Sequence, residues 1–496
     1  MIALTLHELA AAMSGRIVLP KGAERSSVLH AAAHAAATET HRDEAHALVF
    51  DGSVETDSRL VGRGSIFFAL PGETTDGHRF IEQSVDAGAA LVVVEREQEH
   101  LEVPQIVVAD GVVALAALAS AVVRRVRAEG RLSVIGITGS NGKTSTKNML
   151  RAILSAEAPT VAPEGSFNNH VGAPISMLRI DHGTRYLIVE MGASGAGEIA
   201  RLAAIAEPDV GVVLKVGLAH AGEFGGIEAT QRAKQELVEA LGEDGVAVLN
   251  ADDGRVAQMA DHTRARVVWF GHSATDGLTA RDVETSAAGT GFTLRGVGSA
   301  ADAGEHHVQL RIIGEHHVMN ALAALTAVRE LGVPLDRAIE ALEGMPRAEQ
   351  WRMELLPERN GVTVINDAYN ASPDSTAAAL KTLAQLTADG AGRSVAVLGE
   401  MAELGEFADE EHDRIGRLVV RLNIKQLVVV GQAARHIHNA AGLEGSWSGE
   451  SILVDTIDEA ERVLETMLRP GDVVLVKSSK SAGLRFLGDR IAGVER

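Results

Sequence analysis

A short stretch near the end of the first third of the chain combines the residue types that bind a polyphosphate. Gly139-Ser-Asn-Gly142 is followed directly by Lys143-Thr144. Glycines let backbone N–H groups approach phosphate oxygens, a lysine can reach the outer phosphates, and a threonine hydroxyl can hold Mg²⁺. A helix that starts here would add positive potential at its N-terminus. These residues predict a site for the phosphates of a nucleotide.

The predicted loop needs a strand before it and a helix after it. Residues 133–138 are mostly apolar, which predicts a buried strand that ends at a half-exposed Thr138, and residues 143–154 show helical periodicity. The common pattern G-x-x-x-x-G-K-[ST] requires glycine at position 137, where isoleucine stands, and the nearest glycine is Gly136. A chance glycine turn before Lys-Thr is the alternative interpretation. The flanking strand and helix favour the phosphate loop.

Composition excludes several classes of protein. The chain has 496 residues, of which 46% are hydrophobic and 23% charged, as in a globular protein of about three domains. A net charge of −21 argues against binding to nucleic acid or to an anionic membrane surface. The absence of cysteine excludes disulfides and thiolate metal sites. We expect a cytoplasmic protein, because the N-terminus carries Glu8 and lacks a basic region, and the apolar run 112–123 is too short to span a bilayer.

The order of predicted elements indicates an α/β protein of three domains. We place them at 1–105, a small α/β domain; 106–345, a doubly wound and mostly parallel sheet that carries the phosphate loop; and 346–496, a Rossmann-like domain without the G-x-G-x-x-G signature.

Within these domains, short apolar segments predict the buried strands. They lie at 64–70, 90–94, 186–190, 210–216, 245–250, 266–270, 362–366, 393–398, 426–430 and 472–476. Alternation with glycine turns over 280–313 predicts an antiparallel edge, and an apolar helix is expected over 321–331.

Two polar residues at predicted strand ends are candidate metal ligands. Glu190 ends a strand at the carboxyl edge of the sheet, where α/β proteins bind ligands, and its carboxylate suits Mg²⁺. His220 follows the next strand, although imidazole is an unusual ligand for this ion. Either residue alone could be an ordinary polar group. In the Ala- and His-rich stretch 21–47, His30 and His34 are spaced to share a helix face, but an exposed insertion is the favoured interpretation.

Five separated motifs together resemble one known family. They are Thr138-Gly-Ser-Asn-Gly-Lys-Thr144, Asp57-Ser-Arg59, Asp76-Gly-His78, Gly165-Ser-Phe-Asn-Asn-His-Val-Gly-Ala-Pro174 and Ile365-Asn-Asp-Ala-Tyr-Asn-Ala-Ser-Pro-Asp374. They are similar to motifs of the Mur ligases, ATP-dependent amide-forming enzymes of peptidoglycan precursor synthesis. The phosphate loop of that family has the same departure from the usual spacing. The last two motifs are similar to those of the pentapeptide-forming members, and the resemblance covers nearly the whole chain.

The resemblance implies roles for matching residues. ATP would be bound by Thr138, Gly139, Ser140, Asn141, Gly142, Lys143, Thr144, Ser145, Asn320, Arg352, Asp367 and Tyr369. Two Mg²⁺ ions would be held by Thr144, Glu190, His220 and a carbamylated Lys234, and the catalytic residues would be Lys143, Glu190, His220 and Lys234. Substrate would be bound by Ser58, Arg59, Asp76, His78, Asn168, Asn169, Asn370, Lys477 and Lys480.

Two of these positions have weaker support from the residues themselves. Without the resemblance, Lys234 would be interpreted as a solvated helix lysine flanked by Glu236 and Glu239. The segment Lys477-Ser-Ser-Lys480 departs from the more usual Lys-Gly-Ser-Arg, which leaves the role of Lys480 open although a cation is kept.

The implied activity is the ATP-dependent addition of D-Ala-D-Ala to UDP-MurNAc-tripeptide. It would proceed through an acyl phosphate to UDP-MurNAc-pentapeptide, ADP and phosphate, in a monomer with no nucleic-acid partner and no membrane insertion. A tripeptide-forming Mur ligase is the nearest alternative, and the third residue of the acceptor peptide, lysine or diaminopimelate, stays open. A GTPase would need Asn-Lys-x-Asp, which is absent. A mechanical ATPase and an inactive nucleotide-binding regulator are further alternatives, and the combination of Lys143, Thr144, Glu190, His220 and Lys234 argues against the second.

Overall fold

The computed structural model describes residues 1–20, 48–72, 75–217, 226–388, 390, 392–445 and 447–495. His220 and the Ala- and His-rich stretch 21–47 lie outside the described residues. Contacts within the chain divide it into two compact units. The first unit comprises 1–136, 158–191 and 200–209, and the second comprises 137–157, 192–199 and 210–496.

The first unit contains a small, mostly parallel sheet with strand order β2-β7-β6-β5-β4. Its strands are β2 (Arg16–Val18), β4 (Val54–Glu55), β5 (Ile66–Phe68), β6 (Leu91–Val94) and β7 (Gln105–Val107), of which only β2 runs antiparallel to its neighbour. Alternate strand residues such as Phe67 and Val92 enter one apolar cluster with Ile81 of helix α4 (Ile81–Asp86). The predicted strands at 64–70 and 90–94 are therefore confirmed as β5 and β6. A separate antiparallel pair is formed by β1 (Leu4–Thr5) and β3 (Val49–Phe50).

The apolar run at 112–123 forms most of helix α5 (Gly111–Arg127), as predicted. The side chain of Asp110 caps its start by accepting from the backbone N–H groups of Val112 and Val113. Three arginines in the last turn lie where the helix dipole favours positive charge. Among the described residues, none of the helices combines the length and apolar character needed to cross a bilayer.

The second unit contains the larger sheet, in which the strand order is β16-β15-β14-β13-β12-β11. These strands are β11 (Val210–Val213), β12 (Val246–Asn250), β13 (Arg266–Phe270), β14 (Gly277–Ser286), β15 (Gly289–Val297) and β16 (Glu305–Leu310). Each strand from β11 to β14 runs parallel to its neighbour. Strand β15 then runs antiparallel to both β14 and β16, so the predicted antiparallel edge is confirmed. Strand β11 ends at Val213, three residues earlier than expected, because residues 214–217 turn toward the phosphate loop.

Strand β8 (Ser133–Thr138) carries the chain into the phosphate loop and has residues in both units. In the second unit, its last residue accepts a hydrogen bond from Leu214, which follows β11. In the first unit, β10 (Tyr186–Glu190) pairs in parallel with β9 (Thr160–Val161). The predicted strand at 186–190 is confirmed.

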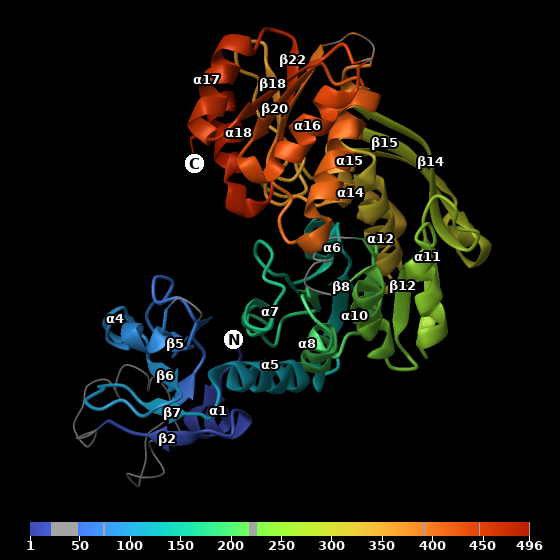
Figure 1. The fold of residues 1–496 in the computed structure, drawn as a ribbon. Coiled ribbons are helices and arrows are strands. Elements are labelled where there is room, and N and C mark those ends of the chain that lie inside the picture. The colour runs from blue at the N-terminus through green and yellow to red at the C-terminus, as the bar shows by residue number, and fades with distance from the viewer. Residues whose placement is uncertain are drawn as a thin grey trace. The chain divides into compact units, whose positions relative to one another are not determined.

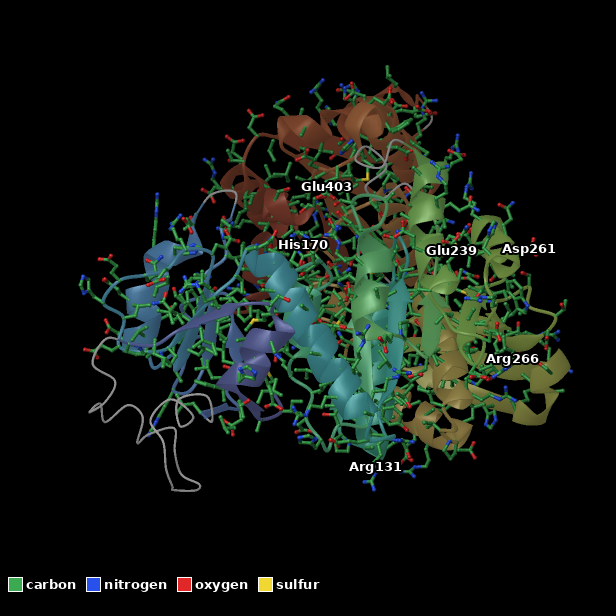
Figure 2. The ribbon with its side chains drawn as sticks, turned by 90° about the horizontal axis from the view of Figure 1, so that it is seen from below. Arg131, His170, Glu239, Asp261, Arg266 and Glu403 are labelled. Atoms are coloured by element: carbon green, nitrogen blue, oxygen red, sulfur yellow. The ribbon has the colours of Figure 1, made fainter. Side chains whose placement is uncertain are left out.

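Four helices of the second unit follow one another around the central sheet or pack on one another beside it. They are α6 (Lys143–Glu157), α10 (Ile227–Glu239), α12 (His316–Glu330) and α13 (Leu335–Glu343). Helix α12 is buried on nearly all sides, because it packs on α6, α13 and five strands of the sheet, β11 to β15. It begins at His316, five residues before the expected start. Three exposed side chains lie on the outer side of this unit (Figure 2). They are Glu239 at the end of α10, Asp261 in η3 (Gln258–His262) and Arg266 at the start of β13.

The C-terminal part of the second unit forms a six-stranded sheet with strand order β17-β18-β22-β19-β20-β21. Its strands are β17 (Glu354–Leu355), β18 (Thr363–Asn366), β19 (Arg393–Leu398), β20 (Gln426–Val430), β21 (Glu450–Val454) and β22 (Asp472–Lys477). Four of these were expected. Strands β17 and β21 were missed: β17 has two residues, and β21 is only partly buried, so neither gives a strong apolar pattern.

Helices cover both faces of this sheet (Figure 1). One face carries α14 (Pro373–Leu386), α15 (Ala408–Arg421) and α16 (Arg435–Leu443), and the other carries α17 (Ile457–Met467) and α18 (Leu484–Ala492). Consecutive strand residues point to opposite faces, so Ile365 joins the first core and Val364 the second. The carboxyl ends of β18 and β22 thereby present polar residues at one edge of the sheet.

Candidate active site

The turn between β8 and α6 has a geometry that requires glycine. Gly142 has φ 87°, and a Cβ atom there would lie 2.4 Å from Oδ1 of Asn320. Asn320, near the start of α12, is therefore packed directly against the phosphate loop. Thr138 is fully buried rather than half-exposed, because it ends a strand in the interior of the sheet.

Hydrogen bonds hold the loop against the chain that follows β11. The Ser140 hydroxyl donates to Gly217 O at 3.0 Å and accepts from Gly217 N at 2.8 Å, and Ser140 N donates to Lys215 O at 2.8 Å. Lys143 Nζ donates to Gly139 O at 2.7 Å, so the lysine folds back over the loop. The loop is thus fixed against residues 215–217, and Lys143 lies over the loop's own backbone.

Arg352 reaches the loop from the linker between the central and C-terminal sheets. Its Nη2 donates to Thr144 Oγ1 at 3.3 Å, and its guanidinium lies 4.4 Å from the ring centroid of Tyr369. Lys480 lies over the same ring, with Nζ 5.7 Å from its centroid. Four predicted site residues from separate parts of the sequence therefore meet beside the first turn of α6.

Two polar residues of α6 that were not predicted from the sequence contact this linker. Asn148 Nδ2 donates to Ala348 O at 2.7 Å and to Glu349 Oε2 at 2.8 Å, and the buried Lys147 lies 4.0 Å from the same carboxylate oxygen. Polar side chains at successive positions of a helix flanked by apolar residues could have marked them. They fix the linker on α6 immediately before Arg352.

The C-terminal sheet brings together two predicted residues that are 110 positions apart. Lys477 Nζ donates to Asp367 Oδ2 at 2.6 Å and to the carbonyl of Asn370 at 3.1 Å. Both charged side chains are buried, at 2% and 9% exposure. Lys477 therefore orients the Asp367–Asn370 loop.

Ser372 links the C-terminal part to the phosphate loop and was not among the predicted site residues. It caps helix α14, and its hydroxyl donates to Asn141 Oδ1 at 3.0 Å. Lys215 lies 3.5 Å from Asp374 in the first turn of the same helix. The motif that contains Ser372 was recognised, but only its neighbours were assigned.

Lys234 lies on the buried side of α10 and is only 3% exposed. Its interpretation as a solvated lysine is therefore wrong: the helix turns Lys234 inward, and Glu236 and Glu239 lie at other positions around the axis. Burial, with a contribution from the positive charge of Lys143, lowers the pKa of Lys234 to about 7.

Two adjacent histidines at the start of α12 complete the surroundings of the loop. The rings of His316 and His317 lie 4.2 Å apart, and Asn320 Nδ2 is 3.3 Å from His317 Nδ1. Burial lowers the pKa of His316 to about 4 and that of His317 well below its usual value, so both are neutral at pH 7. Sequence analysis did not assign them, although the pair directly precedes an apolar helix.

In the first unit, Glu190 meets the Asn-Asn motif. Its Oε1 accepts from Ser166 Oγ at 2.8 Å and from Asn168 Nδ2 at 2.9 Å. Asn169 Oδ1 accepts from Gly172 N at 2.8 Å at the start of α7 (Gly172–Met177). Glu190 ends strand β10, as predicted, and its carboxylate is fully buried.

The two short acidic motifs of the first unit are each organised by a carboxylate. Asp57 binds the exposed guanidinium of Arg59, and this pairing lowers the pKa of Asp57 to about 2. Asp76 accepts from the backbone N–H of His78 and lies 2.7 Å from its ring Nδ1, and Arg96 donates to the same carboxylate. Nearby, Ser58 Oγ lies 3.5 Å from Gln83.

Comparison with known proteins decides the family. Three family profiles match in sequence: the Mur ligase family catalytic domain at residues 52–132, the Mur ligase middle domain at 137–328, and the Mur ligase glutamate ligase domain at 351–480. The chain belongs to the Mur ligase family.

Curated relatives of this Mur ligase match over nearly their whole length. It is 45% identical to the UDP-N-acetylmuramoyl-tripeptide–D-alanyl-D-alanine ligase of Mycobacterium tuberculosis, over 91% of this chain and 94% of that protein. The enzyme of the same name from Bacillus subtilis is 34% identical, over 87% and 91%. Among solved structures, MurF from Acinetobacter baumannii superimposes with a TM-score of 0.83 at 30% identity, over 99% of both chains. MurF ligase from Thermotoga maritima in complex with ADP superimposes with a TM-score of 0.75 at 29% identity, over 88% and 96%.

The Mur ligase relationship confirms the predicted fold class and the prediction of an ATP-dependent peptide ligase. The roles of individual residues stay predictions. Within the described part of the chain, three or more His, Asp or Glu side chains do not gather into a metal-binding cluster. Mg²⁺ commonly takes only one or two protein ligands, with phosphate and water completing its shell.

Proposed function

We propose that this Mur ligase joins D-Ala-D-Ala to UDP-MurNAc-tripeptide with ATP, giving UDP-MurNAc-pentapeptide, ADP and phosphate. The observation that carries the proposal is the 45% identity, over 91% of the chain, to an enzyme named for this reaction. The whole-length superposition on MurF structures supports it independently. A tripeptide-forming activity is not favoured, because the structure of a diaminopimelate ligase matches at only 18% identity.

The phosphate loop suits ATP. Among the described residues, Asn141 Nδ2 and Arg352 Nε are buried hydrogen-bond donors without a partner. Both belong to side chains that contact the loop or its neighbour Thr144. Donors of this kind match the oxygen-rich phosphates of a nucleotide. His317 Nε2 is also buried without a partner, and the other ring nitrogen lies 3.3 Å from Asn320 Nδ2, so this ring can serve the base or ribose.

Two Mg²⁺ ions complete the proposed site, and they would neutralise charge on the β- and γ-phosphates. The proposed ligands are Thr144, Glu190, His220 and a carbamate on Lys234. A carbamate forms when a neutral amine attacks the carbon of CO₂, making an N–C bond and releasing one proton. The lowered pKa of Lys234 supports this step, because a substantial fraction of its amine is neutral at physiological pH.

The residues of this chain supply positioning and charge compensation for the reaction. The terminal carboxylate of the tripeptide attacks the γ-phosphorus of ATP, and the bond from that phosphorus to the bridging oxygen breaks to release ADP. The amine of D-Ala-D-Ala then attacks the carbonyl carbon of the acyl phosphate, forming the amide and releasing phosphate and a proton. Lys143 and Arg352 stabilise negative charge that develops on the transferred group. Tyr369 and Thr144 hold Arg352 in place for this task.

We further propose that the three predicted domains divide the substrates. Residues 1–105 bind the uridine nucleotide through Ser58, Arg59, Asp76 and His78; residues 106–345 bind ATP; and residues 346–496 bind ATP and the dipeptide, the latter with Asn370, Lys477 and Lys480. Asn168 and Asn169 contact the peptide substrate. The working unit is a monomer in the cytoplasm, where ATP and UDP-linked precursors are available.

One assay tests the proposal. Phosphate release is measured with ATP, Mg²⁺ and UDP-MurNAc-tripeptide, with and without D-Ala-D-Ala, and the product is weighed by mass spectrometry. We expect release that depends on the dipeptide and a product heavier by D-Ala-D-Ala minus water. Release that ignores the dipeptide, or product formation from UDP-MurNAc-dipeptide and a free amino acid, would refute the assignment.

A further inference from the structure

We infer that Trp351 is a positioning residue for Arg352, and that it is anchored for this purpose by Asp489 of helix α18. The inference deepens the proposed function, since it rests on Arg352 acting at the ATP phosphates. Neither residue belongs to the motifs described above. The two lie 138 positions apart and meet only in the folded protein.

The backbone on both sides of Arg352 is held in an unusual conformation. Trp351 has φ 55° and Met353 has φ 47°, in the left-handed region that bulky side chains rarely adopt. Such residues persist only where surrounding contacts determine the conformation, and they gather at functional sites. Arg352 is thus carried on a short, sharply bent segment whose shape fixes where its guanidinium points.

Several hydrogen bonds hold this segment. Trp351 N donates to Glu354 Oε2 at 2.9 Å, and Trp351 O accepts from Tyr369 N at 3.1 Å. Met353 N donates to Asp367 Oδ1 at 3.0 Å. Another bond comes from the indole itself, which donates through Nε1 to Asp489 Oδ2 at 2.9 Å. Three of these bonds involve Trp351, so this residue fixes the bend.

The anchor on α18 is rigid. Asp489 is 4% exposed, and its other oxygen accepts from Asn366 Nδ2 at 3.1 Å. The Trp351 ring is also flanked by Arg485, 5.5 Å from its centroid, and meets Phe486 edge-on at 6.1 Å. Trp351 is therefore clamped to the C-terminal sheet and helix, while the neighbouring Arg352 reaches out to Thr144.

This arrangement gives the C-terminal part control over a residue at the phosphate loop. If the indole bond is removed, the left-handed bend loses one of its supports and can relax. The guanidinium would then leave its place between Thr144 and Tyr369. Displacement of a positioned group by about 1 Å can reduce a rate about 100-fold.

The test compares two tryptophans that make equivalent bonds. Trp351→Phe removes the indole N–H but keeps an aromatic ring. The matched control is Trp447→Phe, which removes the 2.9 Å bond from Trp447 Nε1 to Ile424 O elsewhere in the same sheet. Calorimetry gives the Kd for ATP with Mg²⁺, and phosphate release gives kcat and each KM, all with the full-length chain. Asp489→Asn is a second variant, since it keeps an acceptor but removes the charge.

We expect Trp351→Phe to weaken ATP binding and lower kcat by about 10- to 100-fold, with the KM for D-Ala-D-Ala unchanged. Asp489→Asn should give a smaller change in the same direction, and Trp447→Phe should stay within about twofold of wild type. In an Arg352→Ala background, adding Trp351→Phe should cause no further loss, because its effect passes through Arg352.

The inference would be overturned if Trp351→Phe and Arg352→Ala lowered ATP affinity and kcat independently, so that their effects multiplied in the double variant. Equal losses in Trp351→Phe and Trp447→Phe would also overturn it. The experiment distinguishes failure of this inference from failure of the proposed function. If wild-type protein does not ligate D-Ala-D-Ala, the proposed function fails, whereas the ATP-binding comparison still decides the role of Trp351.

Discussion

Lys477 and Asp367 form a buried ion pair that joins the carboxyl ends of the neighbouring parallel strands β22 and β18, with 2.6 Å between Nζ and Oδ2. Lys477 also donates to the Asn370 carbonyl. It thereby holds the loop that carries Tyr369 beside Arg352. A single buried pair thereby connects the stability of the C-terminal sheet to the shape of the site.

Removing one partner of this pair should destabilise the protein strongly. Lys477→Met leaves the Asp367 carboxylate buried without its cation, which typically costs about 3–5 kcal/mol. Denaturant unfolding followed by circular dichroism measures the change. Lys480→Met is the control, because Lys480 is exposed and should change stability by less than about 0.5 kcal/mol. A loss of less than about 1 kcal/mol in Lys477→Met would contradict the structural role.

Lys143→Ala should abolish most activity while the fold persists. The lysine donates to the loop carbonyl of Gly139. Removal of one electrostatic contact of the kind proposed for Lys143 raises a barrier by about 3–4 kcal/mol, or 10²- to 10³-fold in kcat. Phosphate-release kinetics measure the loss, and circular dichroism checks the fold. Turnover close to wild type in a folded variant would exclude Lys143 from the reaction.

The pH dependence of stability should report the buried state of Lys234. Its folded pKa of about 7 lies below the unfolded value of about 10.4, so between these the unfolded chain binds more protons and stability rises with pH. In CO₂-free buffer, wild type should gain up to about 1.4 kcal/mol per pH unit between pH 7 and 9 relative to Lys234→Met. Parallel stability curves for the two proteins would show that the amine is not buried in neutral form.

The same lysine should react with CO₂. With ¹³C-bicarbonate, wild type should show a carbamate carbon resonance that Lys234→Met lacks, and activity should rise with bicarbonate only in wild type. Lys215→Met is a suitable control, since this lysine is half-exposed and pairs with Asp374. A resonance that survives in Lys234→Met would place the carbamate elsewhere.

Arg59→Ala should weaken binding of the uridine substrate without affecting stability. Its side chain is 82% exposed and pairs with neighbouring Asp57, and exposed pairs contribute about 0–1 kcal/mol. We expect a higher KM for UDP-MurNAc-tripeptide and an unchanged KM for ATP. Arg16→Ala, which breaks an exposed pair with Glu97 in the same unit, should change neither. Equal effects of both variants would remove Arg59 from the substrate site.

Local sequence patterns predicted the central buried strands and helices α5 and α6 because each pattern reflects local physical rules. Strands β10 and β13 begin and end where the apolar runs do, and α5 and α6 follow their periodicity. The start of α12 was missed because polar His316 and His317 do not look like part of an apolar helix, although they are buried.

The sequence by itself determined the α/β class, the phosphate loop and, through separated motifs, the family. Only the tertiary structure decided which side chains meet. Arg352 reaches Thr144 across 208 positions, Trp351 reaches Asp489 across 138, and Lys477 pairs with Asp367 across 110. Such pairs depend on how strands and helices pack at long range, which local periodicity does not encode. Burial works in the same way: the sequence around Lys234 indicates a solvated helix face, and only packing turns that lysine into a buried amine with a pKa of about 7.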